Sequence, residues 1–191
     1  DAVRFLAKCG VAMVPRGRGT GKAGGCIPGE REVVLSTERL THAPTVRRDD
    51  LIVEAGAGVL AEAFDQAAAE VGLFYPPDPN SLAVSSIGGN VATNAGGPRA
   101  VKYGLTSHYL LGLTVVLPDG DVVELGAQTI KCVAGANLTG LMLGSEGTMG
   151  LITAVRSRLI ARPKSVQTAL VTFASTAAAV AAVGALFRCS V

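Results

Sequence analysis

Five glycines and three basic residues lie within the twelve-residue stretch VPRGRGTGKAGG, residues 14–25. Glycine allows φ > 0 and lets the main chain approach a ligand closely. Successive backbone N–H groups in such a turn form a concave site for an anion. Pro15 stiffens the entry to the loop, because its ring fixes φ. The stretch therefore favours a phosphate or diphosphate site over a flexible surface loop.

Two familiar phosphate-binding motifs can be tested against this loop. The P-loop pattern G-x-x-x-x-G-K-[ST] fails, because Arg16 stands at its first glycine and Ala23 at its hydroxyl position. The dinucleotide pattern G-x-G-x-x-G matches residues 19–24, but it requires a helix directly after the loop. Residues 26–32 contain proline and glycine instead, and residues 33–35 predict a strand. The loop is therefore predicted to hold phosphate by its backbone alone.

A second glycine cluster, residues 76–104, has a different chemistry. Its sequence PPDPNSLAVSSIGGNVATNAGGPRAVKYG combines prolines, two Gly-Gly pairs, asparagines and hydroxyls. Such a surface offers backbone donors and neutral amides to a planar heterocycle that carries carbonyls and ring nitrogens. Its centre has no histidine, cysteine or lysine for proton abstraction or nucleophilic attack. The cluster therefore predicts a binding surface and not an acid–base centre.

The elements that must position these two loops follow from the hydrophobic pattern. Residues 50–55 predict a strand, and apolar residues at helical spacing over 59–71 predict an amphipathic helix that ends at Gly72. Residues 111–125 predict a β-hairpin around the turn at 118–120. Helices mixed with an antiparallel hairpin indicate an α+β fold and not a doubly wound sheet.

Both ends of the sequence predict incomplete units. Residues 1–10 have the pattern of the second half of a helix that stops at Gly10, so we expect the sequence to begin inside a domain. A short helical turn over 138–143 is followed by a glycine turn and a further strand. Residues 165–173 predict another strand, and Ser175 is predicted to cap a terminal helix. This last β–α unit is expected to open a second domain.

Composition excludes several classes of function. The 191 residues are 49% hydrophobic and 17% charged, with a net charge of +2, which predicts no nucleic-acid partner. No stretch reaches the roughly 20 apolar residues of a membrane span. Four scattered cysteines and two histidines lack metal-type spacing, so no metal site is predicted. The cysteines are expected to be small buried hydrophobes in a reducing cytosol.

Four blocks of the sequence resemble, in the same order, those of FAD-linked oxidases of the vanillyl-alcohol-oxidase type: PRGRGTGKAGG, PPDPNSLAVSSIGGNVATNAGG, VKYGLTSHYLLGLTVVLPDGDVV and LTGLMLGSEGTMGLITAV. The nearest branch holds the glycolate oxidase flavin subunit, D-lactate dehydrogenase and D-2-hydroxyglutarate dehydrogenase. The resemblance implies a PCMH-type FAD-binding domain of two α+β lobes over residues 1–163, truncated at its N-terminus. It assigns residues 164–191 to the beginning of a C-terminal cap domain for the substrate.

The resemblance also implies the cofactor and its contacts. The cofactor would be FAD, bound non-covalently, because the first glycine loop contains no histidine for attachment. The diphosphate loop would be Arg16, Gly17, Arg18, Gly19, Thr20, Gly21 and Gly24. The flavin would be bordered by Pro77, Asp78, Pro79 and Ser81. Its ring and phosphate region would be lined by Ser86, Gly88, Gly89, Asn90, Thr93 and Asn94. The adenosine half and ring edge would be closed by Glu146, Gly150 and Ile152.

The implied activity is an FAD-dependent dehydrogenase or oxidase that converts a 2-hydroxy acid, such as glycolate or D-lactate, to the 2-oxo acid. The base and the substrate arginines would come from the cap domain, so no catalytic residue is nominated and the chain alone is expected to be inactive. His108 is interpreted as a local hydrogen-bonding group, and His42 is placed in a polar turn. An iron–sulfur or other electron-transfer subunit is an implied partner. The implied location is the cytoplasm, with partner-mediated association at the inner face of the membrane.

Three alternatives stay open on the sequence. The first is a flavin-dependent synthase of the same fold, which performs no net oxidation. The second is a subunit that only carries flavin or passes electrons within a larger oxidase. The third is a nucleotide-binding protein that reads phosphate with Arg16 and Lys22 but holds no flavin.

Overall fold

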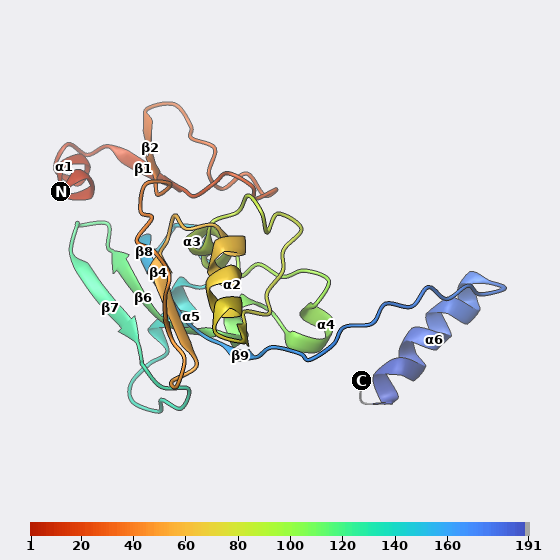
Figure 1. The fold of residues 1–191 in the computed structure, drawn as a ribbon. Coiled ribbons are helices and arrows are strands. Elements are labelled where there is room, and N and C mark those ends of the chain that lie inside the picture. Colours follow the sequence, from red (N-terminus) through yellow and green to blue (C-terminus); the bar gives the residue numbers. More distant parts are fainter. Residues whose placement is uncertain (190–191) are drawn as a thin grey trace.

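A five-stranded antiparallel sheet forms the main body of the computed structural model, which describes residues 1–189 (Figure 1). The strand order across the sheet is β3 (Thr45–Arg47), β4 (Ile52–Gly56), β8 (Leu151–Arg158), β6 (Leu110–Val116) and β7 (Val122–Gly126). The predicted hairpin is β6 and β7, whose register pairs Val116 with Val122. Its turn forms as expected, because Gly120 takes φ 90° and its N–H donates to Leu117 O.

Two helices pack against the sheet and form the core with it. The predicted amphipathic helix is α2 (Ala61–Glu70), which buries Phe64 and Ala68. The helix α3 (Ile87–Ala92) contacts β8, and Ile87 is fully buried. A third, short helix, α5 (Leu138–Met142), lies against β6 and β7. The core cluster joins both helices to the central strands β4 and β8, so residues 86–92 rest on a rigid support.

A smaller lobe lies beside this body (Figure 1). It consists of α1 (Ala2–Lys8), β1 (Ala12–Arg16) and β2 (Glu32–Ser36), and the two strands run parallel. The guanidinium of Arg4 joins the lobe to the hairpin turn, donating to Asp121 Oδ1 at 2.8 Å and to Gly120 O at 3.2 Å. The α+β fold of two lobes, predicted from the sequence, is confirmed.

Short elements complete the body below the sheet. The strand β5 (Leu73–Phe74) pairs with β9 (Ile160–Ala161), while α4 (Ala100–Tyr103) precedes the 3₁₀ turn η1 (Thr106–His108). The prolines of residues 76–79 hold the chain extended between β5 and the second glycine cluster, as predicted.

The C-terminal arm leaves the body after β9 and carries α6 (Thr176–Arg188) (Figure 1). Ser175 Oγ accepts a hydrogen bond from the Ala178 N–H at 3.2 Å, so the predicted N-cap is present. The strand predicted over residues 165–173 is wrong, because this segment has no regular structure. Its apolar residues favour a strand, but a strand requires a neighbour to take its backbone hydrogen bonds, and the described residues supply none.

Candidate cofactor-binding site

A cleft of about 390 Å³ lies between the small lobe and the body. Four segments line it: the glycine-rich loop after β1, the end of β2, the region of α3, and the turn that leads into β8. Its lining residues from the glycine-rich loop are Pro15 to Cys26. The others are Thr37, Ser81, Ser86, Gly88, Gly89, Asn90, Ala92, Thr93, Ala95, Glu146, Gly147, Gly150, Leu151 and Ile152.

The glycine-rich loop presents a row of free backbone donors. It begins where β1 ends, and no helix follows it, as the sequence predicted. Gly19 and Gly24 take φ of 69° and 85°, a conformation that side-chain-bearing residues rarely adopt. Within residues 1–189, no backbone N–H from Gly17 to Cys26 donates to a protein acceptor. Backbone N–H groups without protein partners suit an anion.

Two of these glycines lie close to side chains on the other side of the cleft. A Cβ placed on Gly17 would lie 2.6 Å from Ser86 Oγ, and one on Gly25 would lie 2.6 Å from Glu146 Oε2. Glu146 itself has a φ of 51° in the turn before β8, and its carboxylate lies next to Gly25. The loop is thereby fixed between α3 on one side and the turn before β8 on the other.

Two buried donors in the cleft have no hydrogen-bond partner among residues 1–189. Ser86 is 1% exposed and Asn90 is 4% exposed, and both line the cleft. Neither Ser86 Oγ nor Asn90 Nδ2 has a partner. An unsatisfied buried polar group costs about 1–3 kcal/mol, so folded proteins rarely keep one without a reason. A ligand with phosphate or carbonyl oxygens would satisfy both, and the donor set of this cleft therefore fits FAD.

Most of the residues predicted to bind the cofactor come together in this cleft. They are Arg16, Gly17, Arg18, Gly19, Thr20, Gly21, Gly24, Ser81, Ser86, Gly88, Gly89, Asn90, Thr93, Glu146, Gly150 and Ile152. Pro77, Asp78, Pro79 and Asn94 do not line it.

These other four residues have visible structural roles. Pro77 and Pro79 are buried in the body. The Asp78 carboxylate accepts the Arg99 backbone N–H at 3.0 Å and pairs with its guanidinium at 3.3 Å. Asn94 takes a φ of 47°, and its Oδ1 accepts the Ser107 N–H at 3.0 Å. The polar members of this group therefore hold neighbouring loops in place.

Some lining residues were not predicted from the sequence. Lys22 and Cys26 belong to the same loop and could have been included with it. Thr37 was missed because it comes from a different segment. Thr37 reaches the cleft because β1 and β2 pair in parallel, which puts the carboxyl ends of both strands at one edge. The Thr37 N–H then donates to Arg16 O at 2.9 Å.

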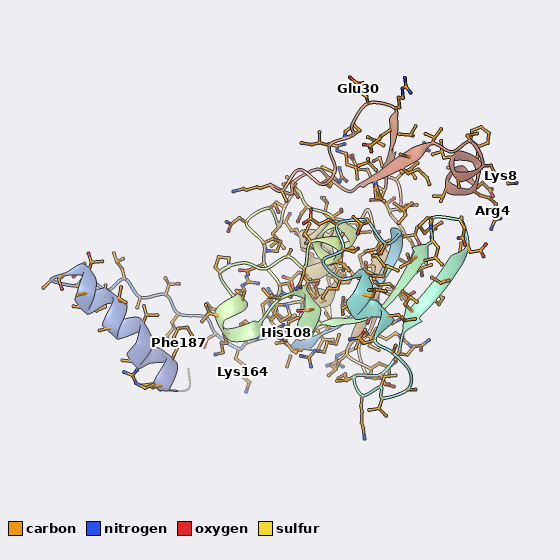
Figure 2. All side chains as sticks on the ribbon, turned by 180° about the vertical axis from the view of Figure 1, so that it is seen from behind. Arg4, Lys8, Glu30, His108, Lys164 and Phe187 are labelled. Atoms are coloured by element: carbon orange, nitrogen blue, oxygen red, sulfur yellow. The ribbon has the colours of Figure 1, made fainter. Side chains whose placement is uncertain are left out.

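The two histidines lie away from the cleft lining. His108 Nδ1 accepts the Leu105 N–H at 2.9 Å, which is the local hydrogen-bonding role predicted for it. Figure 2 shows His108 low in the body, far from the small lobe where Glu30 lies. His42 O accepts the Gly56 N–H at 3.0 Å. Among residues 1–189, no group of three or more acidic, histidine or cysteine side chains is placed to hold a metal ion.

The cleft, with its row of free backbone N–H groups outside any helix, is suited to a nucleotide cofactor. Residues 1–126 match the family model of the FAD binding domain, and the chain belongs to this family. The resemblance to FAD-linked oxidases of the vanillyl-alcohol-oxidase type is confirmed, and the cofactor is FAD.

Relatives share much of the sequence. The glycolate oxidase subunit GlcD of Bacillus subtilis (strain 168) is 40% identical over 92% of this chain and 38% of its own length. The D-lactate dehydrogenase of Anaerostipes hadrus is 40% identical over 93% of this chain and 37% of its own length. A solved alkyldihydroxyacetonephosphate synthase superposes with a TM-score of 0.73 at 28% identity, covering 85% of this chain and 32% of that one. The chain thus spans about a third of the length of these relatives.

Within the described residues, the structure contains no helix with the length and apolar character needed to span a membrane.

Proposed function

We propose that this chain is the FAD-binding part of an oxidoreductase that converts a 2-hydroxy acid, such as glycolate or D-lactate, to the 2-oxo acid. The observation that carries the proposal is the cleft, with its row of free backbone N–H groups and its two buried, unpartnered donors. The relatives at 40% identity support the class of substrate, because their names are glycolate oxidase subunit and D-lactate dehydrogenase.

Each lining segment has a separate role in this proposal. The backbone N–H groups of residues 17–24 hold the diphosphate, because an anion is the natural partner of a row of free donors. Ser86 and Asn90 donate to acceptor atoms of the cofactor from the α3 side. The turn at 146–152 covers the adenosine half. FAD bound here would take up two electrons from the substrate, and the residues of this chain would supply its position.

The cofactor is proposed to be held without a covalent bond. Within residues 1–189, no histidine lines the cleft. Cys26 lines it and is the side chain whose thiol could form a covalent bond to the flavin. Acid precipitation of the purified protein should therefore leave a yellow supernatant and a colourless pellet. A yellow pellet that becomes colourless in a Cys26→Ser variant would contradict the proposal and identify the thiol as the attachment point.

The remaining parts of the reaction are proposed to lie outside residues 1–163. We assign these residues to the FAD-binding domain and residues 164–191 to the beginning of a substrate-binding cap domain. Among the residues that the structure describes, none beyond residue 152 lines the cleft, which agrees with this division. We further propose an electron-transfer partner, such as an iron–sulfur subunit, and a place in the cytoplasm at the inner face of the membrane.

The direct test is anaerobic mixing of the FAD-loaded protein, at its full natural length, with glycolate, D-lactate and D-2-hydroxyglutarate. Oxidation would transfer the α-hydrogen with its electron pair to the flavin and the hydroxyl proton to a base, so a true substrate should bleach the flavin absorbance. Acetate and propionate, which lack the hydroxyl group, are the controls and should cause no bleaching. Absence of bleaching by every hydroxy acid would overturn the proposed activity.

A second candidate is a flavin-dependent synthase, which is favoured by the fold match to alkyldihydroxyacetonephosphate synthase. That match has 28% identity, against 40% for the glycolate and D-lactate enzymes. The same mixing experiment distinguishes the two, because a synthase would keep its flavin oxidised with all three hydroxy acids.

A further inference from the structure

One carboxylate pairs with both arginines of the glycine-rich loop. Glu38 Oε1 lies 3.4 Å from Arg16 Nη1, and Glu38 Oε2 lies 3.5 Å from Arg18 Nη1. Both arginines line the cleft, whereas Glu38 does not. The carboxylate therefore contacts the two guanidinium groups from outside the cleft lining, with no direct contact to what the cleft holds.

The segment that carries Glu38 is fixed to both lobes. On the side of the small lobe, the Thr37 N–H donates to Arg16 O at 2.9 Å. On the side of the body, the Gly58 N–H donates to Leu40 O at 2.9 Å, and a Cβ on Gly58 would lie 3.0 Å from Glu38 O. A shift of the backbone around Glu38 would therefore break hydrogen bonds to both lobes.

The guanidinium of Arg16 in turn supports the backbone of the loop. A Cβ on Gly19 would lie 2.7 Å from Arg16 Nη2 and 3.0 Å from Arg16 Nε, so this group lies close beside the loop main chain at Gly19. Arg18 lies between the two glycines of this turn, Gly17 and Gly19. A loop with so many glycines is otherwise costly to order, since each residue fixed loses conformational entropy.

We propose that Glu38 is a positioning residue for cofactor binding, which holds Arg16 and Arg18 so that the loop 17–25 is already ordered before the diphosphate arrives. The proposal rests on the placement of the diphosphate under "Proposed function". Ion pairs as exposed as these contribute little to global stability. The effect of Glu38 is therefore expected in cofactor affinity and loop order, with little change in the stability of the whole protein.

A purely electrostatic role for Glu38 would act in the opposite direction. Removing a negative charge near a site for an anion should tighten binding, most strongly at low salt where screening is weak. Loss of loop order should instead weaken binding at every salt concentration. The sign of the change in affinity therefore separates the two roles.

The test uses the protein at its natural length, with Glu38→Gln as the variant and Glu70→Gln as the matched control. Glu70 is an exposed residue at the end of α2, and it does not line the cleft. The dissociation constant of FAD is measured by flavin fluorescence on the apoprotein, at low and at high salt. Trypsin cleavage of the apoprotein after Arg16, Arg18 and Lys22 is followed in parallel by mass spectrometry.

We expect Glu38→Gln to raise the dissociation constant about fivefold at both salt concentrations, comparable to the cost of ordering roughly one more loop residue. Trypsin should cut the loop faster in this variant, and Glu70→Gln should match the wild type in both measurements. In an Arg18→Gln background, the effect of Glu38→Gln on affinity should shrink, because one of its two partners is gone. Glu38→Asp, which keeps the charge, should recover part of the affinity and so exclude a folding defect.

Unchanged or tighter FAD binding by Glu38→Gln, or unchanged cleavage of the loop, would overturn this role. A wild-type protein that binds no FAD would instead overturn the proposed function itself, so the two failures can be told apart.

Discussion

Removing the unpartnered hydroxyl of Ser86 is expected to affect the stability of the apoprotein and its affinity for FAD in opposite directions. In the apoprotein, Ser86→Ala removes a buried group that has no hydrogen-bond partner, so the free energy of unfolding should stay the same or rise by up to about 1 kcal/mol. The same change should weaken FAD binding by roughly tenfold, since one donor to the cofactor is lost. Urea unfolding and flavin fluorescence measure the two quantities.

The neighbouring residue Ser85 is a matched control for this experiment. It is also 1% exposed and its hydroxyl is also unpartnered, but it does not line the cleft. Ser85→Ala should therefore leave FAD affinity unchanged. Equal losses of affinity in both variants would show that Ser86 acts through packing and not through a hydrogen bond to the cofactor.

Gly19 is predicted to be essential for cofactor binding. Valine at this position would force a β-branched residue into a φ of 69° and would push its side chain into the Arg16 guanidinium. Gly19→Val should therefore give protein that is purified without flavin, as judged by its visible spectrum. Gly10→Val is the control, because Gly10 has a similar φ of 65° but has open space around it and lies outside the cleft. Loss of flavin in both variants would indicate general unfolding.

Tyr75 makes stability depend on pH in the alkaline range. Burial raises the pKa of its phenol well above the ordinary value of 10.0, and the nearby hydroxyls of Thr106 and Ser157 lower this pKa only in part. Because the fold favours the neutral phenol, this contribution to stability is complete below pH 10 and is lost as the pH rises above it.

The matching variant is Tyr75→Phe, which removes the ionisable group and keeps the aromatic packing with Phe64. At pH 7 the free energy of unfolding should change by less than about 1 kcal/mol, because the hydroxyl has no partner with good geometry. Above pH 10 the variant should lose stability less steeply than the wild type in urea unfolding experiments. A parallel decline in both proteins would show that other groups control the alkaline transition.

At the scale of elements, the sequence predicted those features that depend only on a few adjacent residues. The hairpin turn at residues 118–120 and the stop at Gly72 depend on backbone preferences of a few adjacent residues. The helix α3 was not predicted, because Gly88 and Gly89 lower its helix propensity. It forms because its apolar residues pack on β8. The strand expected at 165–173 failed for the converse reason, since propensity without a pairing neighbour does not produce a strand.

The candidate site likewise has parts that local sequence reveals and parts that depend on long-range pairing. The glycine loop and the residues around α3 could be found from the sequence because each is a continuous stretch of unusual composition. Thr37 and Glu38 could not, because neither has an unusual neighbourhood in the sequence. They reach the site only through the parallel register of β1 and β2, which pairs Arg16 with Ser36. Long-range pairing of this kind is not encoded in any single segment.

Asp78 was predicted to border the flavin, and its contacts predict a role in joining two loops. Its carboxylate, of which only 14% is exposed, takes both the backbone N–H and the guanidinium of Arg99. Asp78→Ala removes both contacts, and because Arg99 is exposed and water can replace the lost acceptor, we expect a loss of about 1 kcal/mol in the free energy of unfolding. Asp78→Asn keeps an acceptor for the N–H and should lose less. If either variant instead loses FAD with unchanged stability in denaturant, Asp78 contacts the cofactor.

At the scale of the whole molecule, the cofactor cleft is a boundary between two lobes. The small lobe is attached to the body near Arg4 on the hairpin side and, on the other, near Leu40, whose carbonyl accepts the Gly58 N–H. A ligand that fills the cleft contacts both lobes, and it binds the folded state alone. FAD should therefore raise the stability of the protein in proportion to the logarithm of its free concentration. This coupling makes thermal stability a convenient measure of affinity for all the cleft variants described above.

The last prediction concerns the C-terminal arm, which makes the molecule extended (Figure 2). The body ends near Arg162, whose N–H donates to Gly72 O at 3.2 Å and whose guanidinium lies over Phe74. Among residues 163–189, no backbone hydrogen bond reaches the body. Val166 is 84% exposed and Leu170 is 95% exposed, and α6 adds further exposed apolar side chains. Apolar surface of this kind promotes association.

A fragment of residues 1–163 should therefore be monomeric and stable, whereas residues 1–191 should self-associate in size-exclusion chromatography with light scattering. Both should bind FAD with the same dissociation constant, because within the described part of the chain all residues that line the cleft lie among the first 152. Neither should be reduced by a 2-hydroxy acid, since the proposed catalytic groups lie elsewhere. A fragment 1–163 that is unfolded, or that binds FAD less tightly, would show that the arm belongs to the cofactor-binding unit and that the boundary at residue 163 is wrong.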